Sequence, residues 1–206
     1  MYSYEALARA LPTLTTTDAA FDSASIAAAG ISDRIEMILF GNRFCAVIVG
    51  HVAARERLGE LSRTVLGREL PTGTAIDEHG NIANLADSSH ELQVAHEMDC
   101  GFVEEAIRLS GATALLAASA ALELLVGDLG SGNPRRPLRQ KILDLTSVEE
   151  CHELADRVIR RRNMLAHELD GSYWSPPLTR LDLSDESVSA SLADVGRLAD
   201  LLEDAV

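Results

Sequence analysis

Three arginines, an asparagine and a histidine are grouped near residue 163 in a way that suits phosphate chemistry. They fall within about two helical turns of one another: Arg160, Arg161, Arg162, Asn163 and His167. A histidine can accept the proton of a ribose 2′-hydroxyl near neutral pH. The planar guanidinium of arginine binds phosphate oxygens and stabilises the charge that grows on them during phosphoryl transfer. The group therefore indicates a site that binds phosphate or cleaves RNA.

A single amphipathic helix over roughly residues 147–169 is predicted to carry this group. Its apolar side chains fall mostly at spacings of three and four residues and form one stripe: Leu154, Val158, Ile159, Leu165 and Leu169. Ser147 followed by Glu150 is typical of a helix start, and Gly171 is typical of a helix end. The arginines, the asparagine and the histidine then occupy the polar face of the helix.

Helical geometry orders the members of the group. Asn163 and His167 lie one turn apart on the same face, and Arg160 shares that face. Arg162 lies about 140° from His167 at 100° per residue, an offset that a long guanidinium can span. Arg161 lies farther from the shared face. We expect His167 to move the proton, Arg162 to bind phosphate, and Asn163 to hold the imidazole ring or a phosphate oxygen.

The motif Arg162-Asn163-x-x-x-His167 resembles the signature of HEPN domains, in which an arginine precedes a polar residue and then a histidine. Arg160 and Arg161 also satisfy the spacing, but only Arg162 is followed by an uncharged polar residue. The family pairs its motif helix with an earlier helix rich in alanine and leucine, and residues 112–126 resemble that helix. The resemblance covers roughly residue 92 to the C-terminus.

This resemblance implies a mainly α fold with an antiparallel helical bundle, and the activity of a metal-independent endoribonuclease in a toxin–antitoxin or phage-defence system. It implies catalytic roles for Arg162 and His167, with RNA as substrate. It also implies a homodimer whose motif helices share one cleft, and a cognate antitoxin or defence partner. Family toxins silenced by nucleotide addition carry a tyrosine two residues after the histidine, where this chain has Leu169. Regulation by that route is therefore not expected.

The charge of the chain is unevenly distributed. The net charge of −14 disfavours general affinity for nucleic acid. Residues 131–163 nevertheless contain eight basic residues against five acidic ones. The basic residues are Arg135, Arg136, Arg139, Lys141, Arg157, Arg160, Arg161 and Arg162. Such a patch favours local phosphate binding, although a solvated helix face and loop can have the same composition. Arg157, Arg160 and Arg161 are therefore candidates for substrate binding.

Two of the candidates also have ordinary structural explanations. Tyr173 follows the predicted motif helix and could stack on a base, but large aromatic residues more often pack into the core. A histidine near a helix end, such as His167, is often stabilised by the helix dipole alone. The phosphate-binding side chains beside His167 favour the catalytic interpretation.

Motifs for metal-dependent chemistry are not found. None of the four His-Glu pairs continues to the second histidine of the HExxH motif, and the glycine-rich residues 127–134 lack the Gly-Lys-Ser/Thr of a phosphate loop. We expect neither a metal nor a cofactor. Cys45, Cys100 and Cys151 lie far apart and are expected to be reduced core residues of a cytoplasmic protein. No membrane attachment is expected, because residues 112–126 are too few to span a bilayer.

Two parts of the chain are separated by polar, turn-forming residues between Gly67 and His90. We expect residues 1–88 to form an N-terminal extension, helical or mixed α/β, and residues 89–206 to form the HEPN-like helical domain. Helices are predicted over residues 4–10, 18–29, 52–66, 102–109, 112–126 and 192–202. Residues 34–51 favour a β-hairpin turning at Gly41-Asn42, with a buried helix as the alternative.

A second hypothesis assigns the chain to a different class of protein. The helix pair and the basic face could form a non-catalytic HEPN-like interaction module that binds a protein, a nucleotide or RNA. The acidity of the whole chain favours this alternative, because it opposes broad contact with RNA. Incubation of the protein with RNA, with and without His167, separates the two hypotheses.

Overall fold

The computed structural model describes residues 3–29, 32, 34–66, 74–76, 82–130, 135–169 and 182–205, with the backbone alone for 66, 74–76, 82–98, 100 and 167–169. The described helices are α1 (Tyr4–Ala10), the 3-10 helix η1 (Leu11–Thr13), α2 (Thr17–Ala29), α3 (Ile35–Leu66), α4 (Leu85–Leu129), α5 (Leu138–Leu145), α6 (Glu149–Leu169) and α7 (Asp185–Ala205). Two short strands, β1 (Thr74–Ile76) and β2 (Ile82–Asn84), pair antiparallel with Ala75 opposite Ala83. The predicted mainly α class is confirmed.

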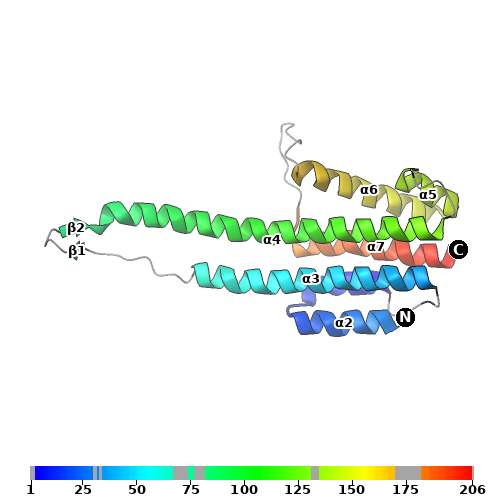
Figure 1. Cartoon of the computed structure of the whole chain (residues 1–206), viewed down its shortest axis with the longest axis horizontal. Coiled ribbons are helices and arrows are strands. Elements are labelled where there is room, and N and C mark those ends of the chain that lie inside the picture. Colours follow the sequence, from blue (N-terminus) through cyan, green and yellow to red (C-terminus); the bar gives the residue numbers. More distant parts are fainter. Residues whose placement is uncertain are drawn as a thin grey trace.

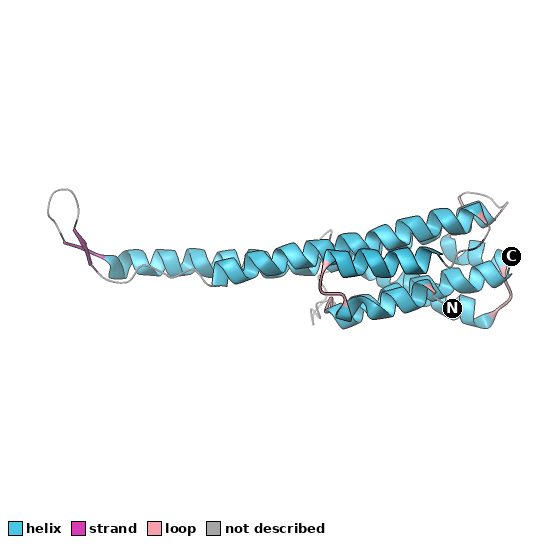
Figure 2. Cartoon of the chain, turned by 90° about the horizontal axis from the view of Figure 1, so that it is seen from below, coloured by secondary structure: helices cyan, strands magenta, loops and turns pink. Residues whose placement is uncertain are grey.

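Helices α3 and α4 form a long antiparallel pair around which the other helices are arranged (Figure 1). They contain 32 and 45 residues. At 1.5 Å per residue, α4 is about 68 Å long. Helix α2 packs on α3, α1 packs on α7, and α7 lies against both α4 and α6. The outer parts of α3 and α4 project from this bundle, with β1 and β2 at the far end (Figure 2).

The hairpin predicted at Gly41-Asn42 is wrong, because α3 runs through it from Ile35 to Leu66. The bulky residues of this segment are buried at helical spacings of three and four: Met37, Phe40, Phe44, Ile48 and Val52. Gly41 does not turn the chain but admits the ring of Tyr4, since a Cβ at Gly41 would lie 2.1 Å from the tyrosine oxygen. Packing of these residues from several sides therefore overrides their preference for strands.

One continuous core joins the N-terminal and C-terminal parts of the chain. Buried side chains of α1, α2 and α3 belong to the same cluster as those of α4, α5, α6 and α7. Ser189 of α7 donates a buried hydrogen bond of 2.8 Å to the carbonyl of Ala8 in α1. The boundary expected at residue 88 falls inside α4, which passes Gly101 without a break. The described residues between 3 and 66 therefore form part of the body that carries the candidate site.

The alanine-rich segment 112–126 is apolar on two sides of α4. The side that faces the bundle is buried: Ala112, Ala114, Leu115, Ala118, Ala121, Leu122, Leu125 and Val126. On the other side Leu124 is 50% exposed, and Ala117 and Ala120 are also exposed. The bundle therefore covers this helix incompletely.

Two described segments are long and apolar enough to cross a membrane by length and composition alone, namely 35–65 and 101–129. Within their most apolar windows, 44% and 56% of the residues are buried inside the bundle. The core helices of soluble proteins pass the same test, so these two segments are weak support for a membrane location.

The predicted motif helix forms as α6, and its apolar stripe is confirmed for the described side chains. Leu154, Val158 and Leu165 are buried, and Ile159 packs against the core. The helix begins at Glu149 rather than at Ser147. At its start the Thr146 hydroxyl accepts a hydrogen bond of 3.1 Å from the Val148 N–H. Cys45 and Cys151 are free and buried, as predicted, whereas the side chain of Cys100 lies outside the described part.

Candidate functional site

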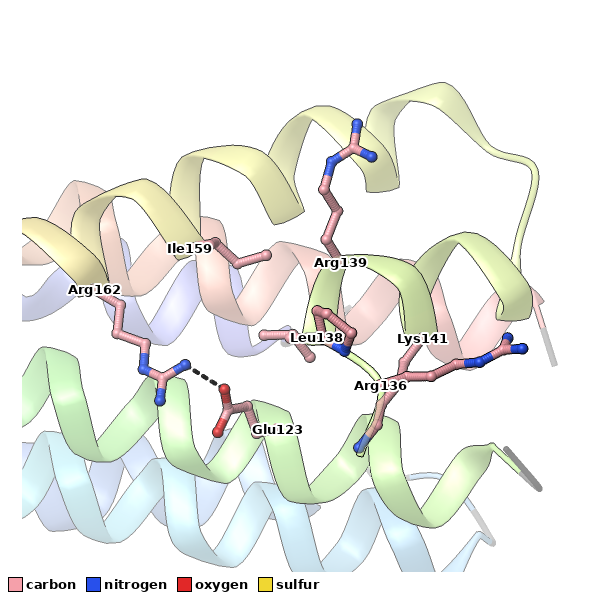
Figure 3. A pocket seen from close by; sticks show the side chains of 8 residues that line it. Glu123, Arg136, Leu138, Arg139, Lys141, Ile159 and Arg162 are labelled. Carbon is pink, nitrogen blue, oxygen red and sulfur yellow. Dashed lines mark hydrogen bonds and ion pairs between the residues drawn. The ribbon is translucent and has the colours of Figure 1, made fainter. Parts of the chain in front are cut away.

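A basic pocket of about 350 Å³ lies where α4, α5 and α6 meet, and we call it the α5 pocket (Figure 3). It is lined by Glu123, Arg136, Pro137, Leu138, Arg139, Lys141, Ile159 and Arg162. Four of these residues are basic and one is acidic, on a chain whose net charge is −14. The pocket therefore gathers part of the basic patch predicted for residues 131–163 around the motif residue Arg162.

Arg162 is held at this pocket by an ion pair across two helices. Its Nη1 donates a hydrogen bond to Oε1 of Glu123 on α4. Figure 3 shows the Arg162 side chain directed from α6 toward α4. The ion pair directs Arg162 toward α4. A carboxylate therefore takes the place on the guanidinium where a phosphate could bind.

Helix α5 and the residues just before it bring three further cations to the pocket: Arg136, Arg139 and Lys141. The α5 residues Leu138 and Ile142 are spaced by one turn and are both buried, so Arg139 and Lys141, which lie between them in sequence, are kept off the core side of the helix. Pro137 precedes the first turn, where its missing N–H costs nothing. Arg139 and Lys141 are thereby placed beside α4 and α6.

Two of these cations are paired with carboxylates. Arg139 donates to Asp156 of α6 at 2.6 Å, which ties α5 to α6. Arg136 pairs with Asp144. The hydrogen bond from Arg139 lowers the pKa of Asp156, and hydrogen bonds from Gln140 and then Arg136 lower the pKa of Asp144. Both carboxylates therefore stay ionised at neutral pH and keep their arginines engaged.

Lys141 differs from its neighbours in the pocket. No ion pair of Lys141 is present within the described ranges. Figure 3 shows its side chain directed toward α4, as that of Arg162 is, whereas the side chains of Arg136 and Arg139 extend away from the pocket. Arg162 and Lys141 are therefore the cations that face the pocket interior.

Other arginines predicted to bind substrate stabilise the contact between α6 and α7 instead. Arg157 makes a bidentate pair with Asp194, with both hydrogen bonds at 3.0 Å, and this pair raises the pKa of Arg157. Arg161 donates to the hydroxyl of Ser187 at 2.8 Å and to the carbonyl of Asp182. Neither arginine lines the α5 pocket.

The remaining motif residues are only partly described. Arg160 and Asn163 are exposed on α6. His167 lies one turn after Asn163 within α6, and its side chain lies outside the described part of the structure. Tyr173 also lies outside the described residues. The geometry therefore brings Arg162 together with Glu123 and Lys141, while the relation of Arg162 to His167 follows from helix position alone.

Sequence reasoning did not identify Glu123 and Lys141 as site residues. Lys141 belonged to the predicted basic patch, and the apolar pair Leu138 and Ile142 at helical spacing was a signal for a short helix there. Glu123 carried no comparable signal, because a single carboxylate in an alanine-rich helix does not reveal its partner.

Comparison with protein-family models, curated proteins and solved structures finds no match to this chain.

Proposed function

We propose that this chain is a HEPN-type, metal-independent endoribonuclease that acts in the cytoplasm as a toxin or phage-defence effector. One observation carries the proposal: the motif arginine, Arg162, lines a basic pocket with Arg136, Arg139 and Lys141. Arg162 and Lys141 face the interior of this pocket, and their positive charge raises the local affinity for phosphate on an otherwise acidic chain. The other motif residues on α6, His167 and Asn163, supply proton transfer and orientation.

The proposed role of each site residue follows from the chemistry of its side chain. His167 accepts the proton of the RNA 2′-hydroxyl, which then attacks the adjacent phosphorus. Arg162 stabilises the charge that develops on the phosphorus oxygens, and Asn163 orients the imidazole or a phosphate oxygen. The attacking oxygen belongs to the substrate, so this scheme needs no metal-bound water. The bond from phosphorus to the 5′-oxygen breaks, and the leaving oxygen takes a proton from the protonated imidazole or from water. The products are a 2′,3′-cyclic phosphate and a free 5′-hydroxyl.

We further propose a twofold homodimer that assembles along α4. The outward face of α4 leaves Ala117, Ala120 and Leu124 uncovered. Leu124 directly follows Glu123, the partner of Arg162. Pairing two copies along this face buries apolar surface and brings two α5 pockets toward one shared cleft. A cognate antitoxin or defence component would then regulate the dimer.

A second candidate function is supported by the intramolecular pairing of the arginines. Arg157, Arg161 and Arg162 all bond to residues of the same chain. A helix whose arginines are engaged in this way suits a non-catalytic HEPN-like module that binds a protein, a nucleotide or RNA. The two functions predict different behaviour toward RNA.

The deciding experiment is RNA cleavage by the full chain in the presence of EDTA, compared with His167→Ala. We expect cleavage that leaves a 2′,3′-cyclic phosphate, and a loss of about a hundredfold or more in the variant. Equal melting temperatures exclude unfolding as the cause. RNA binding without cleavage, unchanged by His167→Ala, would assign the chain to the non-catalytic class. Cleavage that requires added magnesium would point to a carboxylate site instead.

A further inference from the structure

We propose that the α5 pocket binds the terminal phosphate of a nucleotide-sized phosphomonoester, and that this phosphate displaces Glu123 from Arg162. The inference rests on the proposed function in giving Arg162 a phosphate-binding role. It goes beyond that function because it assigns a ligand class, a positioning role for Glu123, and a direct contact for Lys141. It concerns equilibrium binding and involves no cleavage step.

The ion pair that the phosphate must replace is weak. The side chains of Arg162 and Glu123 are 39% and 37% exposed, so water screens their attraction. Ion pairs that water reaches in this way contribute little to stability. A phosphomonoester has up to two negative charges and three acceptor oxygens, and it binds guanidinium through two parallel hydrogen bonds. A phosphate can therefore compete with Glu123 for Arg162.

A second cation is available to the same phosphate. Lys141 and Arg162 are directed toward α4 from α5 and α6 respectively (Figure 3). Lys141 has no ion pair within the described ranges, so a phosphate there does not have to displace a carboxylate from the lysine. Glu123 is the one acidic residue in the lining, and its partial exposure lets its carboxylate turn toward solvent when the phosphate enters.

The size and the apolar wall of the pocket limit the ligand. Pro137, Leu138 and Ile159 form an apolar surface beside the two interior cations. Such a surface accommodates the sugar or base of a nucleotide, whose faces are poorly hydrated. The volume of about 350 Å³ lies near the lower end of small-ligand pockets, at roughly 300–1,000 Å³. A single nucleotide fits this description, either free or at the end of an RNA chain.

Calorimetric titration of the full-length His167→Ala protein tests the inference without cleavage. The probes are inorganic phosphate, adenosine 5′-monophosphate, and one short oligoribonucleotide with either a 5′-phosphate or a 5′-hydroxyl. We expect the monophosphate or the 5′-phosphorylated oligonucleotide to bind, and inorganic phosphate to compete. Binding of the monophosphate alone identifies a free nucleotide as the source of the phosphate, and binding of the phosphorylated oligonucleotide identifies an RNA end.

Variants assign the binding to this pocket. Lys141→Ala should weaken binding of the best probe about tenfold, as expected for a lost charge-assisted contact. Glu123→Gln keeps a hydrogen-bond acceptor for Arg162 but removes the competing charge, so it should tighten binding about threefold or more. Arg57→Ala and Glu60→Gln are matched controls, because these residues form an exposed pair on α3 outside the pocket. Both should leave binding unchanged.

Three outcomes overturn the inference. One is the absence of binding for every phosphate probe. Another is equal binding of the 5′-phosphate and 5′-hydroxyl oligonucleotides, which assigns the affinity to backbone phosphates. The third is weaker binding of Glu123→Gln together with no effect of Lys141→Ala. None of these results depends on whether the wild-type chain cleaves RNA, so the inference and the proposed function fail separately.

Discussion

Arg162 on α6 and Glu123 on α4 form an ion pair that joins the predicted motif helix to the longest helix of the fold. The pair places the motif arginine in the lining of a basic pocket and gives it a carboxylate partner of the same chain. Arg157 and Arg161, by contrast, join α6 to α7 and to the residues just before it. Arg162 therefore belongs to the candidate site, whereas Arg157 and Arg161 stabilise the contact between helices.

This division predicts different effects for neighbouring arginines. Arg162→Ala should lower RNA cleavage by about a hundredfold or more with little change in melting temperature, because it removes charge stabilisation in the transition state. Arg161→Ala should affect stability more than cleavage, because it removes hydrogen bonds to Ser187 and Asp182. Single-turnover cleavage and thermal unfolding of both variants check this. An equal loss of cleavage in the two variants would contradict the division.

The exposed side of α4 predicts that activity depends on assembly. Leu124 is 50% exposed, so Leu124→Glu should leave the monomer folded but place a charge in the proposed dimer interface. We expect light scattering to show that the variant is a monomer, and we expect the variant to lose RNA cleavage. The wild type should lose specific activity when it is diluted enough to dissociate. Phe21→Glu is a matched control on α2, since Phe21 is 63% exposed. A wild-type monomer with constant specific activity would rule the composite site out.

Two glycines predict opposite responses to the same substitution. A Cβ at Gly196 of α7 would lie 2.6 Å from the backbone carbon of Tyr4, so Gly196→Ala must push α1 away from α7. We expect it to lower the free energy of unfolding by roughly 2 kcal/mol or more, as overpacking does. A Cβ at Gly50 would meet no described residue outside its own helix backbone within 4 Å, so Gly50→Ala should stabilise α3 by about 0.5–1 kcal/mol. Denaturant unfolding of both variants measures the two effects.

A half-buried carboxylate at the contact between α1 and α7 predicts a pH dependence of stability. Burial raises the pKa of Asp200 to about 6, although the backbone N–H groups of Glu5 and Tyr4 bond to it and oppose the shift. The folded state therefore binds this proton more tightly than the unfolded chain does. The contribution of Asp200 to stability is fully present below the unfolded pKa near 3.8, and it is lost as the pH rises through 6.

Asp200→Asn removes this titration and keeps a similar shape. We expect the variant to be more stable than the wild type at pH 8, by up to about 3 kcal/mol for a pKa raised from 3.8 to about 6. The difference should shrink as the pH falls toward 4. Denaturant unfolding of both proteins at several pH values measures the difference directly, and other titrating groups cancel in the comparison. A difference independent of pH would exclude Asp200 as the cause.

Local sequence patterns determined a large part of the helical structure. The bounds predicted for α1 are those observed, and the stripe of Leu154, Val158 and Leu165 in α6 is buried. These features depend on the spacing of apolar residues along a few turns, which the chain carries without reference to its neighbours. The basic patch over residues 131–163 was visible for the same reason, because it is contiguous in sequence.

Tertiary structure alone decided the conformation of residues 35–51, the single core and the surroundings of Arg162. The β-branched and aromatic residues of α3 suit either a strand or a buried helix, and contact with Tyr4 and the other helices selects the helix. Arg162 and Glu123 are thirty-nine residues apart, so no local pattern relates them. Their pairing depends on how α6 packs against α4, which is set by burial of apolar side chains distributed over the whole chain.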